Sequence, residues 1–80
     1  MNAAEIRNML SRCFTMLYFR YRGKDGHVDP YYTPKAGYSY LLWYDEKEML
    51  VHSLEEAMNS PFFEGHSLAE IAEKLTDVEW

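Results

Sequence analysis

The sequence predicts a small α+β domain in which one helix, a three-stranded antiparallel sheet and two short helices follow one another along the chain. Apolar residues recur at helical spacing before residue 14 and again after residue 67. Between these stretches, apolar and aromatic residues alternate with the period of two that is typical of strands. The 80 residues suffice for one hydrophobic core, so we expect residues 1–80 to form a single domain.

The first helix is predicted from a stripe of apolar side chains. The stripe has spacings of three and four residues and consists of Ile6, Met9, Leu10 and Cys13. Asn2 and Glu5, three residues apart, have the spacing of a capping box at the start of this helix. We expect Cys13 to be a small buried apolar residue, because nothing near it in the sequence would activate a thiol.

Three strands are predicted, over residues 14–22, 38–44 and 48–52. Gly23 ends the first strand, and the polar segment 45–47 forms the turn of a hairpin between the other two. Alternation divides the side chains of these strands between two faces of the sheet. The face expected in the core carries Leu17, Phe19, Leu41, Trp43, Met49 and Val51.

Residues 23–37 are predicted to form a long loop. Three glycines and two prolines in this segment disfavour a continuous strand or helix. Lys24, Asp25 and Gly26 have the composition of a tight turn, which would allow a short hairpin extension. A loop of this length in so small a domain is often functional.

Two short helices are predicted after the sheet. Ser53 with Glu56, and Ser67 with Glu70, each have the spacing of a capping box. Pro61 ends the first of these helices near residue 59. The second has an apolar stripe that consists of Leu68, Ile71, Ala72 and Leu75. The tail, residues 76–80, alternates enough to form either a short strand or an extended end.

The net charge of −5 is unevenly distributed along the chain. Residues 1–37 contain six Lys or Arg and three acids, a net charge of +3, whereas residues 38–80 contain two lysines and ten acids, a net charge of −8. Ten of the thirteen aromatic residues, including all seven tyrosines, lie between Phe14 and Tyr44. A basic, aromatic segment is therefore followed by an acidic, helical one.

Composition also favours a compartment. The longest run without a charge, residues 36–44, is less than half of a membrane span, so we expect no membrane contact. The first residues lack the pattern of a secretory signal peptide. The single cysteine, Cys13, cannot form an internal disulfide. Together these features favour the reducing cytoplasm.

Signals for catalysis or metal binding are weak in this sequence. Asp25, His27 and Asp29 are ligand types for zinc or manganese, but no second cluster stands at a ligand-like spacing, and a turn stabilised by the aspartates is favoured. The four glycines match no phosphate-binding loop. Cys13 could in principle pair with any of the three histidines for nucleophilic catalysis, but 80 residues leave little room for a catalytic pocket as well. We therefore expect a non-enzymatic protein without a metal or a cofactor.

Tyrosine and arginine side chains on the second face of the predicted sheet form the candidate site. Most would share one side if the first two predicted strands pair, and loop 23–37 adds the others. The candidate partner-binding residues are Tyr18, Arg20, Arg22, Tyr31, Tyr32, Tyr38, Tyr40 and Tyr44. Because Tyr and Arg are enriched at interaction hot spots, this set predicts a small interaction or regulatory module that binds another protein. The alternative is that the helices, or loop 23–37, cover this face and the tyrosines pack beneath them with their hydroxyl groups hydrogen-bonded.

Other partners remain open at this stage. The same face would suit single-stranded nucleic acid, by stacking bases and contacting phosphates, although an acidic domain lacks long-range attraction for phosphate. The acidic C-terminal helices would let the protein act as an inhibitor or nucleic-acid mimic in a basic groove. A core this small is also compatible with a homodimer, formed through the tyrosine face or through an edge strand.

Overall fold

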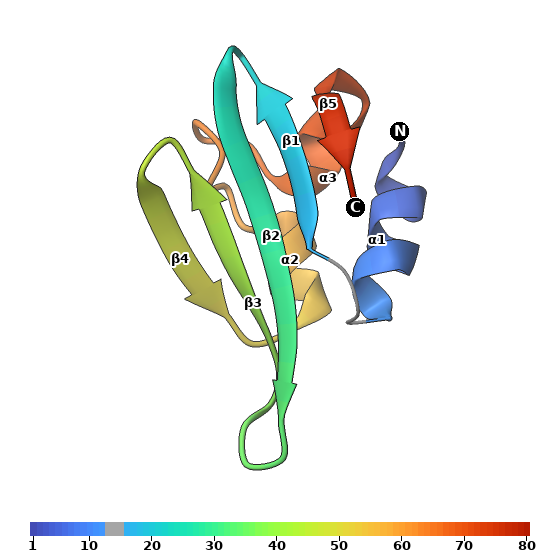
Figure 1. Cartoon of the computed structure of the whole chain (residues 1–80), viewed down its shortest axis with the longest axis vertical. Coiled ribbons are helices and arrows are strands. Elements are labelled where there is room, and N and C mark those ends of the chain that lie inside the picture. The colour runs from blue at the N-terminus through green and yellow to red at the C-terminus, as the bar shows by residue number, and fades with distance from the viewer. Residues whose placement is uncertain (13–15) are drawn as a thin grey trace.

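The computed structural model describes residues 1–12 and 16–80 and confirms the α+β class (Figure 1). The elements are, in chain order, α1 (Ala3–Ser11), β1 (Leu17–Tyr21), β2 (Lys24–Thr33), β3 (Gly37–Tyr44), β4 (Lys47–Val51), α2 (Leu54–Asn59), α3 (Leu68–Ile71), the 3-10 helix η1 (Ala72–Lys74) and β5 (Thr76–Glu79). In Figure 1, α2 and α3 lie behind the sheet, and α1 packs against α2, α3 and η1.

The sheet has five antiparallel strands, in the order β4-β3-β2-β1-β5. The prediction of three strands in an α-β-β-β-α-α order is therefore wrong. One additional strand, β2, comes from the segment predicted to be a loop. The other, β5, comes from the tail, where a strand and an extended end both remained open. β5 pairs with β1 and forms one edge of the sheet, and β4 forms the other.

A two-residue turn directs the chain from β1 into β2. Arg22 and Gly23, with φ angles of 53° and 76°, connect Tyr21 to its cross-strand partner Lys24. Positive φ at both central residues matches a type I′ turn, whose twist suits a hairpin. The tight turn thus lies two residues earlier than the predicted one. Residues 24–26, which were predicted to form the turn, therefore belong to strand β2.

Pro30 lies within β2 but at a place where a strand tolerates it. The pairing of β1 with β2 ends at Leu17 opposite Val28. In the described part of the chain, Pro30 therefore has a hydrogen-bonding neighbour on the β3 side alone, as at a sheet edge. The far end of β2 turns back at Gly37, which has a φ of 78°, and Thr33 Oγ1 accepts a hydrogen bond from the Ala36 amide at 3.1 Å.

Gly26 is the residue that lets β1 and β2 pack closely on the core side. It lies directly opposite Phe19, and a Cβ at position 26 would be 2.6 Å from the Phe19 ring. The ring is only 2% exposed and meets Phe63 edge to face, with 5.7 Å between ring centroids. A Cβ at position 26 would therefore have to displace a buried ring that packs on Phe63. The glycine is required by this close approach rather than by its backbone angles.

Strand β3 places in the core the side chains opposite to those predicted. Tyr40, Leu42 and Tyr44 are buried, whereas Leu41 and Trp43 are half-buried on the other face. The prediction for Leu41 and Trp43 is therefore wrong. Both faces of β3 carry apolar residues, so alternation alone does not determine which face is inside.

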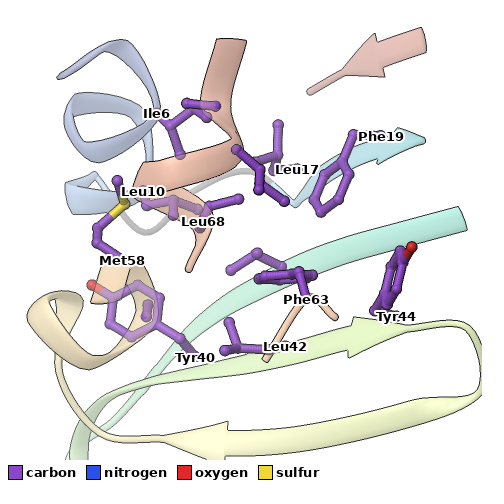
Figure 2. Packing of buried hydrophobic residues seen from close by; sticks show 14 of the residues in the cluster. Ile6, Leu10, Leu17, Phe19, Tyr40, Leu42, Tyr44, Met58, Phe63 and Leu68 are labelled. Carbon is purple, nitrogen blue, oxygen red and sulfur yellow. The ribbon is translucent and has the colours of Figure 1, made fainter. Parts of the chain in front are cut away.

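The core lies between the sheet and the helices (Figure 2). Leu17, Val28 and Leu42 lie opposite one another on adjacent strands, which puts all three on the same face. Predicted core residues Leu17, Phe19 and Val51 are buried, and Met49 is partly buried against the same cluster. Figure 2 shows Leu17, Phe19 and Leu42 directed toward side chains from the helices and from the segment between α2 and α3. These side chains include Ile6, Leu10, Met58, Phe63 and Leu68.

The buried Tyr44 is held by its hydroxyl group. The hydroxyl oxygen lies 2.6 Å from Glu64 Oε2 and 2.9 Å from the carbonyl oxygen of Tyr21, so its proton is within reach of two acceptors. Burial, with a further contribution from the Glu64 carboxylate, raises the pKa of Tyr44 above its ordinary value. The hydrogen bond from Tyr44 lowers the pKa of Glu64. A tyrosine that alternation placed on the outer face is thus accommodated in the core.

The predicted helix starts are confirmed. Asn2 and Ser67 each form a complete capping box, with Glu5 and Glu70 respectively. Ser53 also caps α2, although the Glu56 carboxylate accepts a bond from the Ser53 hydroxyl. The backbone and side chain of Ser67 are the main cause of the lowered pKa of Glu70.

The predicted helix ends are confirmed for α2 but only in part for α3. Helix α2 ends at Asn59, before Pro61, as predicted. The stripe after Ser67 is buried at Leu68, Ile71 and Ala72, but α3 is a single turn continued by η1. The predictions for Cys13 and for the first residues of the first strand lie outside the described residues. No helix within residues 1–12 and 16–80 is long and apolar enough to cross a membrane.

Replacing Gly26 by alanine is expected to lower the free energy of unfolding by about 1–3 kcal/mol, because the added Cβ overpacks against the Phe19 ring. Urea denaturation followed by circular dichroism measures this loss. A double-mutant cycle with Phe19→Leu provides the control, because the smaller side chain leaves room at position 26. An equal cost of Gly26→Ala in both backgrounds would show that the ring does not impose the glycine.

Replacing Tyr44 by phenylalanine is expected to raise the pKa of Glu64 toward its ordinary value, because the hydroxyl that lowers it is removed. Since the pKa of Glu64 is lowered in the folded state, its contribution to stability is present above the unfolded pKa and is lost as the pH falls through the folded pKa. The difference in stability between wild type and variant should therefore narrow in acid. Carboxyl carbon NMR titration of Glu64 measures the shift directly, and an unchanged pKa would contradict the assignment.

Candidate functional site

The face of the sheet opposite the helices is the candidate site, and we call it the open face. It is nearest to the viewer in Figure 1, with no described helix in front of it. Side chains alternate along β1, with Leu17, Phe19 and Tyr21 buried and Tyr18 and Arg20 exposed. Strands β2, β3 and β4 place further aromatic and apolar residues on the same side.

A row of five residues crosses the open face from edge to edge, and we call it the central row. Cross-strand pairing aligns its members, one from each strand. In order from β5 to β4 they are Glu79, Tyr18, His27, Trp43 and Glu48. Three ring side chains are therefore flanked by a carboxylate on each edge strand.

The three rings of the central row contact one another. His27 stacks on Trp43, with 5.1 Å between centroids and an interplanar angle of 7°. Tyr18 meets His27 edge to face, at 5.7 Å. Tyr18 is 48% exposed, whereas His27 and Trp43 are half-buried. The result is a continuous aromatic surface held in place by the sheet.

A cavity of about 430 Å³ lies over one part of this surface. Its walls include the aromatic rings of the central row, and β5 contributes Asp77 and Glu79. Asp77 has a φ of 50°, at a register shift in the pairing of β5 with β1. This bulge brings two acidic side chains of the edge strand to the cavity.

Beside the central row, β3 and β4 place apolar side chains on the open face. Leu41 lies opposite Leu50 on β4, and both belong to the next row of the sheet, together with Asp29 of β2. Leu50 is 46% exposed and Leu41 is half-buried. The apolar surface thus continues from the aromatic rings toward β4.

Most charged side chains on the open face are acidic. Arg20 is the one Lys or Arg side chain that the described strands place on it, and its guanidinium pairs with Asp25 at 3.0 Å. The same guanidinium donates to the carbonyl oxygen of Gly23, so Arg20 reinforces the β1–β2 turn. The acidic members of the face or of its cavity are Asp25, Asp29, Glu48, Asp77 and Glu79.

The structure brings together only some of the candidate partner-binding residues. Tyr18, Arg20 and Tyr31 lie on the open face. The two predicted strands that were to pair are separated by β2, so the expected single tyrosine face does not form. Tyr40 and Tyr44 are buried on the helix side.

The remaining candidates lie at the ends of hairpins. Tyr32 and Tyr38 are cross-strand partners near the turn between β2 and β3, on the side opposite to Tyr18, and both are exposed. Their rings are 5.0 Å apart. Arg22 lies in the first turn, with its guanidinium over the Tyr21 ring at 5.5 Å. None of these three belongs to the central row.

Sequence reasoning missed His27 and Trp43 as members of the site. His27 was considered with Asp25 and Asp29, as part of a turn or a metal loop. The period-two spacing of these three residues was a strand signal, and all three lie on the open face of β2. Within the described residues, no group of three or more His, Cys, Asp or Glu is placed to hold a metal ion.

Comparison with known proteins returns no match: no family model, curated protein or solved structure is significantly similar to this chain. The site is therefore interpreted from its own geometry and charge.

Replacing Leu42 by alanine is expected to cost about 2–5 kcal/mol of unfolding free energy, because Leu42 is fully buried. Replacing its neighbour Trp43 by alanine should cost only about 1 kcal/mol, since the larger residue loses mainly cross-strand contacts such as the stack on His27. Urea denaturation of the two variants under identical conditions measures both losses. A larger loss for Trp43→Ala would show that the open face belongs to the core.

Proposed function

We propose that this protein is a non-enzymatic interaction module of the cytoplasm that binds a basic segment of a partner protein on its open face. The observation that carries the proposal is the central row, an aromatic surface flanked by carboxylates on a sheet face that no described helix covers. The single cysteine of the chain supports the compartment.

The surface has the composition of an interface centre. Tyr18 and Trp43 belong to residue types that supply large contact areas and are enriched at hot spots. Leu50, nearly half exposed, extends the apolar area beside them. The rigid sheet fixes these side chains before binding, which lowers the entropic cost of association.

The charge of the surface selects the partner. Glu48 and Glu79 flank the rings at both edges, and Arg20 is already engaged by Asp25. A segment with Lys or Arg residues between apolar ones complements this arrangement. A second copy of the same face would instead bring like charges together. Charge thus favours a different, basic protein over a homodimer through this face.

Charge also argues against single-stranded nucleic acid as the occupant. Binding to phosphates requires unpaired cations beside the stacking platform. On the open face the rings are present, but the surrounding groups are mainly carboxylates, which repel phosphate. Aromatic rings would suit either a protein or a nucleic acid, and the acidic charge around them favours a protein.

A selection from a library of displayed random peptides tests the proposal. We expect enriched peptides to combine basic and apolar residues and to shift the amide NMR signals of Tyr18, His27 and Trp43. Replacing Tyr18 by alanine should weaken these peptides at least about tenfold, as expected of a hot-spot residue. The affinity is measured by fluorescence anisotropy of the labelled peptide.

The matched control is Tyr32→Ala, which removes a tyrosine of similar exposure from the opposite side of the sheet. This change should leave peptide affinity unaltered. Enriched peptides that bind both variants as well as wild type would contradict the proposal. So would an oligodeoxythymidine that shifts the central row with affinity falling steeply as salt rises, because this result would assign the face to nucleic acid.

A further inference from the structure

We propose that the cavity between the aromatic rings and β5 binds the guanidinium group of one arginine of the partner segment. This inference rests on the proposed function and specifies the anchor of the partner. It depends on three features of the cavity: its size, its aromatic wall and the carboxylates of Asp77 and Glu79.

The size and the wall suit a planar cation. The volume of about 430 Å³ is at the lower end of the range for small-molecule sites, so the cavity accommodates one long side chain. Tyr18 and Trp43 contribute ring surface to its lining. A guanidinium stacks on aromatic rings and is attracted by their electron-rich faces.

The carboxylates supply the charge. Among the described residues, neither Asp77 nor Glu79 forms an ion pair, whereas Asp25 in the same lining is paired with Arg20. Arg20 also lines the cavity, but its charge is paired with Asp25, so among the described lining residues the charges of Asp77 and Glu79 are left without an ion-pair partner. An incoming guanidinium would donate hydrogen bonds to both carboxylates, and its forked N–H groups match the geometry of carboxylate acceptors.

Arginine fits these features better than lysine. A lysine ammonium is a compact and strongly hydrated charge, which gains less from stacking on a ring. The cavity offers a ring surface and carboxylates together, and the guanidinium uses both at once. The remainder of the partner segment would then extend over Leu41 and Leu50.

A set of three short peptides tests the inference. The probe is acetyl-Gly-Gly-Arg-Gly-Gly-amide, compared with the same peptide containing lysine and with one containing citrulline, the neutral analogue of arginine. The arginine peptide should produce saturable NMR shifts at the Trp43 indole N–H and at the Glu79 amide, with a dissociation constant of about 1 mM. The lysine and citrulline peptides should bind at least about fivefold more weakly, since each lacks charge or planarity.

The variant Asp77→Asn, Glu79→Gln removes both charges and preserves shape, and asparagine tolerates the positive φ at position 77. We expect it to weaken the arginine peptide about tenfold, which corresponds to the loss of charge-assisted bonds. Glu73→Gln, an exposed acid of η1 outside the cavity lining, is the control and should change nothing.

Equal binding of the lysine or citrulline peptide, or of the arginine peptide to the double variant, would overturn the inference. Absence of shifts with all three peptides would overturn it as well. The proposed function has a separate readout in the selected peptides. If these bind the open face without arginine, the inference fails and the function stands. If no selected peptide binds the open face, the function itself fails.

Discussion

The register of β1 on β2, set where the Phe19 ring lies on Gly26, is the constraint on which the rest of the structure depends. Side chains alternate along a strand, so a slip of one residue would exchange the two faces of the sheet. The pairing of β2 with β3 in turn determines that Leu42 points into the core and that Trp43 lies on the open face. The ring over the glycine therefore determines both what is buried under the helices and what the open face presents.

The fold also changes how charge is distributed, compared with the order of charges along the sequence. The basic and acidic halves of the sequence do not remain separate, because cations of the first half pair with acids of the second or with acids near them. Arg7 pairs with Glu55, and Lys24 lies 3.5 Å from Asp45. Exposed pairs of this kind contribute little to stability. Their consequence is that the open face, built largely from the basic half, is bordered by acids from β4 and β5.

Local signals in the sequence were sufficient for the helices and for part of the sheet. A cap and its partner are three residues apart, so Asn2 and Ser67 were readable without knowledge of the fold. Strand β2 could not be predicted from the sequence, because a strand tolerates its glycine and its proline only in this tertiary context. Gly26 lies against the Phe19 ring of the neighbouring strand, and Pro30 lies beyond the last residue of β1 that pairs with β2. The prediction of which face of β3 is buried was wrong for a related reason. Its inward tyrosine needs an acceptor such as Glu64, twenty residues away, and alternation contains no such information.

A strand with apolar residues on both faces buries one set and presents the other, and this condition joins the fold to the proposed role. Tyr40 and Leu42 fill the core, which leaves Leu41 and Trp43 on the open side. Exposed apolar sheet surfaces promote association, and so do unpaired edges. Here Glu48 stands on one edge strand, and a bulge interrupts the pairing of the other. Because Glu48 and Glu79 would bring like charges together if two copies met at this face, the proposed partner is a basic segment rather than a second copy.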